Sequence, residues 1–69
     1  MNGAELGLAD AYRDWFRLVD EDERGGSVTS DEAKATLMLV REAEQALASR
    51  DERDAVYYAV KEALRTGKP

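Results

Sequence analysis

Carboxylates are the most plentiful side chains in this sequence that could take part in chemistry. The chain of 69 residues holds 15 Asp and Glu and contains neither Cys nor His. Those two absences exclude zinc sites of the Cys/His kind, thiol chemistry and the Ser–His or Cys–His pairs of nucleophilic enzymes. Carboxylates such as Asp10 and Asp14 lie one helical turn apart, but catalysis needs a buried carboxyl group with a raised pKa. We therefore expect no enzyme activity, no catalytic residue and no cofactor.

The acidic stretch after the first apolar segment has a simple structural interpretation. Gly25-Gly26 suits the left-handed backbone conformation that ends helices. Thr29 and Glu32 match the capping box, in which the Thr hydroxyl accepts from an early backbone N–H and the Glu carboxylate reaches back to the cap. This interpretation predicts a helix end, a short loop and a new helix start, and it needs no ligand.

The same stretch also resembles an EF-hand calcium loop. Residues 16–22 look like the end of an entering helix with the first two loop acids, and residues 26–32 look like the second half of the loop. The spacing departs from the family, because residues 20–32 make 13 residues where the usual loop has about 12. Residues 33–69 contain no second loop. The resemblance implies an alternative function, calcium binding, and the metal ligands that it implies are Asp20, Asp22 and Glu32.

The charge of the chain argues against a nucleic-acid partner. Its formal net charge is −5, whereas affinity for nucleic acid rests largely on clustered Lys and Arg. A helix-turn-helix DNA binder is a third alternative in which residues 50–54 would open the reading helix, but three carboxylates there would repel phosphates.

No apolar run reaches the roughly 18 residues of a membrane span, and residues 1–9 do not follow the pattern of a secretory signal. We therefore expect a cytoplasmic protein with neither a nucleic-acid nor a membrane partner.

Apolar residues recur at helical spacing in three segments, with no sustained alternating run. This periodicity predicts a single all-α domain over residues 1–69. Residues 1–7 carry two glycines, and we expect them to be frayed or only partly helical. The predicted helices lie near residues 5–24, 30–48 and 50–66, followed by a tail at 67–69. Their apolar stripes are, in chain order, Leu8, Tyr12, Trp15 and Val19; Leu37, Val40 and Leu47; and Val56, Val60 and Leu64.

No Gly or Pro separates the second and third segments, so the phase of their stripes must decide between one helix and two. Leu47 and Val56 are nine residues apart, which at about 100° per residue puts the two stripes on opposite sides of a straight helix. A tight turn lets both stripes face one core, and Ser49 with Glu52 matches a second capping box. We predict a turn near Ser49, with an unbroken helix in an intertwined dimer as the alternative.

The stretch Leu37–Val40 is the segment around which we expect the chain to be organised. Four large apolar side chains in a row sweep about 300° of a helix surface, whereas a helix covered on one side needs an apolar stripe of little more than about 100°. Leu37 and Val40 would face the core of the domain. Met38 and Leu39 would then need partners on other sides of the helix.

The surplus of large apolar residues predicts association. A chain this short buries only enough apolar area to offset the entropy lost on ordering, and contiguous exposed apolar patches usually mark interfaces. We expect a small three-helix bundle or helical hairpin assembly that forms a homodimer, the commonest closed assembly. The function that follows is an acidic protein-interaction module of the regulatory, adaptor or phage accessory kind, which acts by binding a protein partner. The predicted interface residues are Trp15, Met38, Leu39, Tyr57 and Tyr58.

Overall fold

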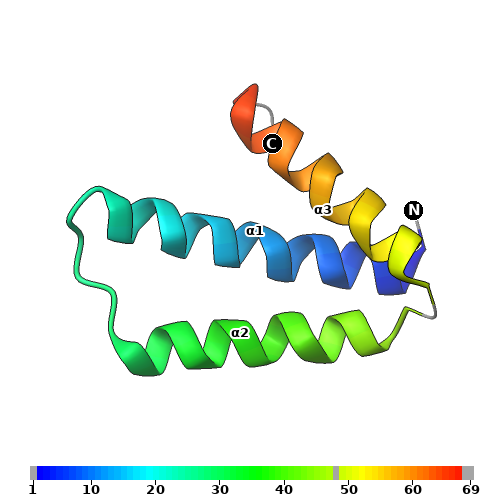
Figure 1. The fold of residues 1–69 in the computed structure, drawn as a ribbon, viewed down its shortest axis with the longest axis horizontal. Helices are drawn as coiled ribbons and strands as arrows, with labels where there is room; N and C mark the ends of the chain where they lie inside the picture. The colour runs from blue at the N-terminus through cyan, green and yellow to red at the C-terminus, as the bar shows by residue number, and fades with distance from the viewer. Residues whose placement is uncertain (1, 48, 68–69) are drawn as a thin grey trace.

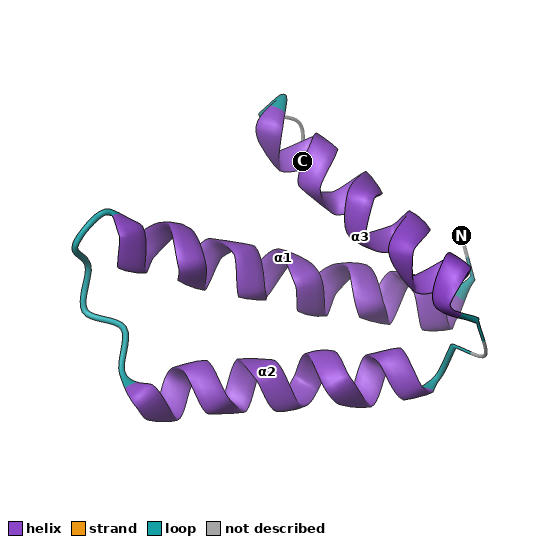
Figure 2. Ribbon diagram, in the orientation of Figure 1, coloured by secondary structure: helices purple, strands orange, loops and turns teal. Residues whose placement is uncertain are grey.

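The computed structural model describes residues 2–47 and 49–67 as three α-helices and, within those ranges, no strand. Helix α1 spans Gly3–Glu23, α2 spans Ser30–Gln45 and α3 spans Arg50–Arg65 (Figures 1 and 2). The predicted all-α fold is confirmed, and the chain turns between α2 and α3 as the stripe phases predict. The residues outside the described ranges include parts of the predicted N-terminal segment, second helix and tail; they are Met1, Ala48, Lys68 and Pro69.

Helix α1 begins earlier than predicted, because Asn2 caps it. The backbone N–H of Glu5 donates to Asn2 Oδ1 at 2.9 Å, and the N–H of Asn2 donates to Glu5 Oε1 at 3.1 Å. This reciprocal capping box satisfies two N–H groups that a helix start would otherwise leave unpaired. The expectation of a frayed or partly helical start was wrong for Gly3 and Ala4, which lie in α1 ahead of the predicted helix start near residue 5. The sequence signal for this helix start is an Asn followed three residues later by a Glu, and it lies ahead of the first apolar stripe.

The two glycines predicted to end the first helix do so, each for a different reason. Gly25 has φ 79° and donates its N–H to the carbonyl of Asp22 at 3.1 Å. Gly26 donates to the carbonyl of Glu21 at 2.9 Å, which completes a Schellman motif. A Cβ on Gly26 would lie 2.6 Å from Glu21 Cγ and 2.9 Å from its carbonyl oxygen. The helix end therefore needs one left-handed residue and one residue without a side chain.

The starts of α2 and α3 use the predicted hydroxyl caps. The N–H of Glu32 donates to Thr29 Oγ1, and the N–H of Glu52 donates to Ser49 Oγ, each at 3.1 Å. These bonds are the hydroxyl half of each predicted capping box. Two acids in the first turn of each helix also lie favourably at the positive end of the helix dipole.

Helix α1 is the element that the other two share. Helices α1 and α2 form an antiparallel hairpin, and α3 crosses α1 (Figure 1). The expectation that residues 37–40 organise the chain was wrong, because Val40 is the one core residue of that stretch and Leu37 is only half-buried. Met38 and Leu39 point away from the core as predicted and are 62% and 55% exposed. Half of the buried core comes from α1. Its members are Leu8, Ala9, Ala11, Tyr12, Val40, Leu47, Val56 and Val60.

The core lies at one end of the hairpin. It gathers where the N-terminal half of α1 meets the start of α3 and the end of α2, and α3 then diverges from α1 toward its own C-terminus (Figure 1). As a result, Val19 near the end of α1 and Leu64 near the end of α3 stay exposed although both belong to predicted stripes. No helix in the described ranges combines the length and apolar character that crossing a membrane requires.

Candidate protein-binding grooves

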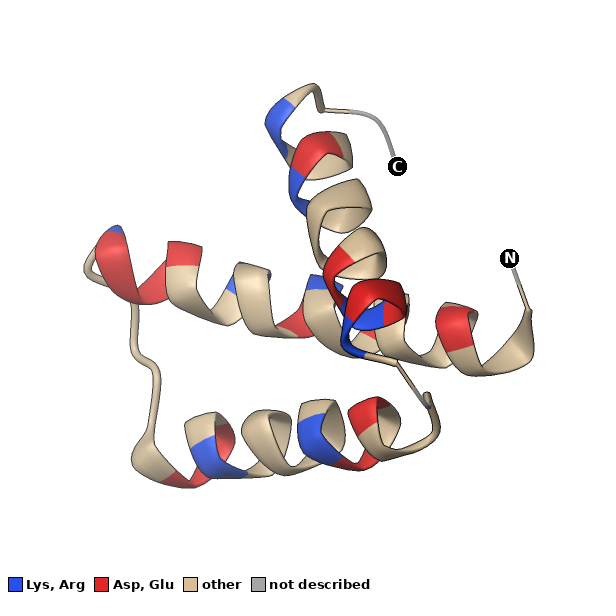
Figure 3. Cartoon of the chain, turned by 45° about the vertical axis from the view of Figure 1, so that its right-hand side comes forward, with Lys and Arg blue, Asp and Glu red and all other residues tan. Residues whose placement is uncertain are grey.

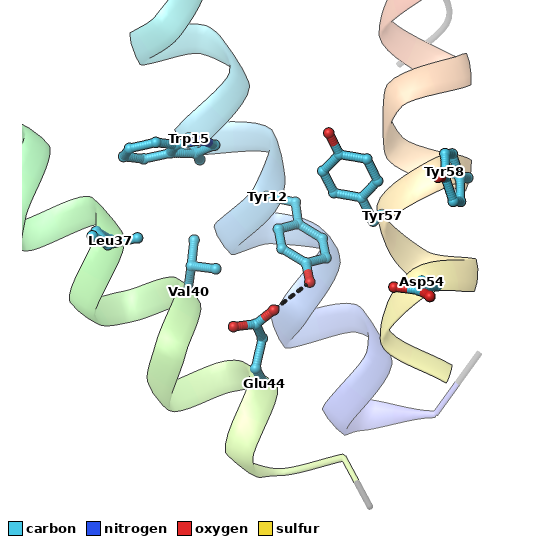
Figure 4. A pocket seen from close by; sticks show the side chains of 8 residues that line it. All are labelled: Tyr12, Trp15, Leu37, Val40, Glu44, Asp54, Tyr57 and Tyr58. Atoms are coloured by element: carbon cyan, nitrogen blue, oxygen red, sulfur yellow. Dashed lines mark hydrogen bonds between the residues drawn. The ribbon is translucent and has the colours of Figure 1, made fainter. Parts of the chain in front are cut away.

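A groove of about 340 Å³ opens over the middle of α1, between α2 and α3 (Figure 4). We call it the aromatic groove. Trp15 lies above Leu37 and Val40 on one side of it, and the tyrosines of α3 stand on the other. Trp15 is half-buried and Tyr58 is 63% exposed, so large aromatic surface meets solvent here. The lining residues are Tyr12, Trp15, Leu37, Val40, Glu44, Asp54, Tyr57 and Tyr58.

Tyr57 connects the aromatic residues of α1 to those of α3. Its ring meets Tyr12 edge-on with centroids 5.5 Å apart, Phe16 at 5.2 Å, and Tyr58 edge-on at 5.3 Å. Edge-to-face and tilted arrangements are the favourable ones for such rings. Tyr57 therefore holds α3 against α1, while Tyr58 presents an exposed ring supported from one side.

One edge of the aromatic groove is acidic. The hydroxyl of Tyr12 donates to Glu44 Oε2 at 2.8 Å, linking α1 to α2, and the carboxylate of Asp54 projects from α3 nearby (Figure 4). The pKa of the Tyr12 hydroxyl is raised above its ordinary 10.0, mainly because the group is buried and, second, because it donates a hydrogen bond to Glu44. Deprotonation would place a second negative charge beside Glu44, so the hydroxyl is held as a donor.

The raised pKa of Tyr12 predicts a loss of stability at high pH. A pKa higher in the folded than in the unfolded chain means that the stabilisation is fully present below about pH 10 and is lost as pH rises through the folded pKa. We expect the free energy of unfolding to fall more steeply above about pH 10 in the wild-type chain than in Tyr12→Phe. Urea unfolding of both chains at pH values above about 10 is the measurement. If the free energy of unfolding fell equally with pH in both chains, the loss of stability would not come from Tyr12.

The structure divides the predicted interface residues between two surfaces. Trp15, Tyr57 and Tyr58 come together in the aromatic groove. Met38 and Leu39 lie elsewhere on α2, and Leu39 borders a shallow depression that α2 forms with the opposite side of α1. Met38 and Leu39 therefore take no part in lining the aromatic groove.

The residues of the calcium alternative do not form a ligand cluster. The carboxylate of Asp20 pairs with Arg24 at 3.2 Å, and Glu32 contributes its backbone N–H to the cap of α2. Across residues 2–47 and 49–67, no group of three or more acidic side chains is placed to hold a metal ion. The structure thus lends the calcium alternative no support.

A second groove, of about 380 Å³, lies between the C-terminal halves of α1 and α3. We call it the basic groove, because four of its seven lining residues are cations. Both acidic and basic residues occur on all three helices (Figure 3). The groove therefore forms where α1 and α3 face each other, and no single basic segment produces it. Sequence reasoning missed it, since its cations are far apart in the chain and the net charge is negative. The lining residues are Phe16, Arg17, Asp20, Arg24, Lys61, Leu64 and Arg65.

Comparisons with protein-family models, curated proteins and solved structures found no match to this chain.

Proposed function

We propose that this chain is a protein-binding module with no chemistry of its own, and that its aromatic groove receives one helix of a partner protein. The observation that carries the proposal is the exposed aromatic surface. Tyr58 is 63% exposed on one side of the groove and Trp15 is half-buried on the other. Tyr and Trp are enriched among the residues that dominate binding energy at interfaces. Contiguous exposed apolar surface is typical of an interaction site.

The arrangement of the helices favours a helical occupant. Helix α3 covers only one end of the α1/α2 hairpin (Figure 1), and the aromatic groove lies beside it. A helix laid in this groove would pack against α3 on one side and against Trp15 and Leu37 on the other. Grooves of this kind bind the apolar face of an amphipathic helix.

The charge of the groove specifies the flanks of that helix. Glu44 and Asp54 are the charged residues among its eight lining residues, and both are acidic. Opposite charges across an interface speed association and select among partners. We therefore propose a partner helix with an apolar stripe flanked by Lys or Arg near these two carboxylates.

A photo-crosslinking amino acid at position 58 tests the proposal in cells that express the chain naturally. The protein captured there is then purified, and its affinity is measured for the wild-type chain and for Tyr58→Ser and Leu6→Ser. Leu6 is the control, because it is 54% exposed on α1 and lines neither groove. We expect Tyr58→Ser to weaken binding by roughly tenfold or more. Equal affinities of the two variants would contradict the proposal.

The exposed pair on α2 supports a second proposal, that the chain also self-associates. Met38 and Leu39 are adjacent and are 62% and 55% exposed. Burial of this pair between two chains would add apolar area that a domain of this size needs. The surface is separate from the aromatic groove, so a dimer could still bind a partner.

Self-association predicts that stability depends on protein concentration, because folding and association are linked. We expect Leu39→Glu to shift the chain to monomers in sedimentation equilibrium. Leu6→Glu is the matched control, since it introduces the same charge at a residue of nearly the same exposure, 54% against 55%. A wild-type chain that is monomeric throughout the micromolar range would contradict the dimer.

A further inference from the structure

We propose that the basic groove binds the acidic end of the same partner helix, so that this chain selects helices with Lys or Arg at one end and Asp or Glu at the other. The inference rests on the proposed function and adds which end of the partner helix lies in which groove. It follows from three observations: the two grooves adjoin, they carry opposite charge, and both have apolar surface.

The two grooves meet at one pair of rings. Tyr57 lines the aromatic groove and Phe16 lines the basic groove, and the centroids of their rings are 5.2 Å apart. Lys61, which lines the basic groove, has its Nζ 5.9 Å from the centroid of the Tyr57 ring. A ligand that packs on Tyr57 is therefore already within reach of a cation of the second groove.

The basic groove keeps positive charge available for a ligand. Asp20 is its one acid, and Arg24 pairs with that carboxylate at 3.2 Å. Arg65 pairs with Glu62, whereas Arg17 and Lys61 make no ion pair within the described residues. In a chain whose net charge is −5, these cations form a local site that attracts acidic groups.

Apolar surface in the basic groove favours a peptide over a free anion. Two apolar residues line it: Phe16, which is half-buried, and Leu64, which is exposed. A simple anion would leave both side chains uncovered. An amphipathic helix covers them with its apolar stripe while its carboxylates meet the cations.

Helix α3 shows the charge order along which the partner would lie. The residues of α3 that line the two grooves run from Asp54 through Tyr57 and Tyr58 to Lys61 and Arg65. Asp54 and Arg65 are 11 positions apart, a rise of about 16 Å, or roughly three helical turns. A partner helix of that length, lying beside α3, would set its basic end against Asp54 and its acidic end against Lys61.

Three fluorescent synthetic peptides test the inference. They share one length and one Leu stripe, and they carry Lys at one end and Glu at the other, Lys at both ends, or Glu at both ends. Fluorescence anisotropy gives their affinities for the wild-type chain, Lys61→Glu and Lys34→Glu. The two variants have the same net charge, but Lys34 is exposed on α2 and lines neither groove.

We expect the peptide with opposite ends to bind most tightly. Lys61→Glu should weaken it about 3- to 10-fold, as reversal of one or two exposed pairs would, and Lys34→Glu should leave it unchanged. The inference would be overturned if the peptide with Lys at both ends bound as tightly as the peptide with opposite ends. It would also be overturned if Lys61→Glu and Lys34→Glu changed the affinity equally. The proposed function would still stand in that case if Tyr58→Ser weakens the peptides. Failure of all three peptides to bind would overturn both.

Discussion

Leu8→Ala should leave the chain largely unfolded at room temperature. Leu8 is 0% exposed at the point where all three helices meet. Truncation of a buried Leu to Ala typically costs about 3–5 kcal/mol, and a single core in a chain of this length supplies about 3–5 kcal/mol in total. Urea unfolding, followed by circular dichroism and by the fluorescence of Trp15, measures the loss.

Leu37→Ala is the matched control for this substitution. From the sequence, Leu37→Ala is predicted to lower the free energy of unfolding by roughly 2–4 kcal/mol, and Val40→Ala by somewhat less. The structure lowers the expectation for Leu37 to about 1 kcal/mol, because this side chain is only half-buried at the edge of the aromatic groove. Equal losses from Leu8→Ala and Leu37→Ala would mean that α1 is not the centre of the core.

Val56→Asp should abolish cooperative unfolding. Val56 is 2% exposed where α3 meets α1, and an unpaired carboxylate at such a site costs several kcal/mol or forces the helix away from the core. Ala59→Asp is the control, since it places the same residue on the exposed side of α3. Thermal unfolding by circular dichroism should show a broad, low-temperature transition for Val56→Asp and a near wild-type one for Ala59→Asp. Similar transitions would contradict the packing of α3 on α1.

Most of the local structure could be predicted from the sequence, because its signals are local. The spacing of Val56 and Val60 marks a buried helical face, and Gly25-Gly26 marks a helix end. The phase difference between Leu47 and Val56 was enough to separate two helices. The start of α1 could not be placed from periodicity, because its capping residues Asn2 and Glu5 come before the first residue of the apolar stripe, Leu8.

The arrangement of the helices could not be predicted, because a stripe shows which face is buried and does not show against which helix. The run Leu37–Val40 indicates a wide apolar surface, yet α1 has the central position. The hydrogen bond from Tyr12 to Glu44 joins residues 32 positions apart, and the basic groove joins Arg17 to Lys61. The first pairing depends on how α2 packs on α1 and the second on the angle at which α3 crosses α1, and side-chain periodicity leaves both open.

The attachment of α2 and α3 to a common helix makes groove width easy to change during evolution. The aromatic groove lies between α2 and α3, and each of these helices packs mainly on α1. The width of the groove therefore depends on how α2 and α3 are each placed on α1. Substitutions at Val56 or Val60 that alter the crossing angle of α3 would widen or narrow the groove without repacking the α1/α2 hairpin. Substitutions on α2 and α3 that are distant from each other should have nearly additive effects on stability. A chain built in this way can acquire a new partner through a few changes on its third helix.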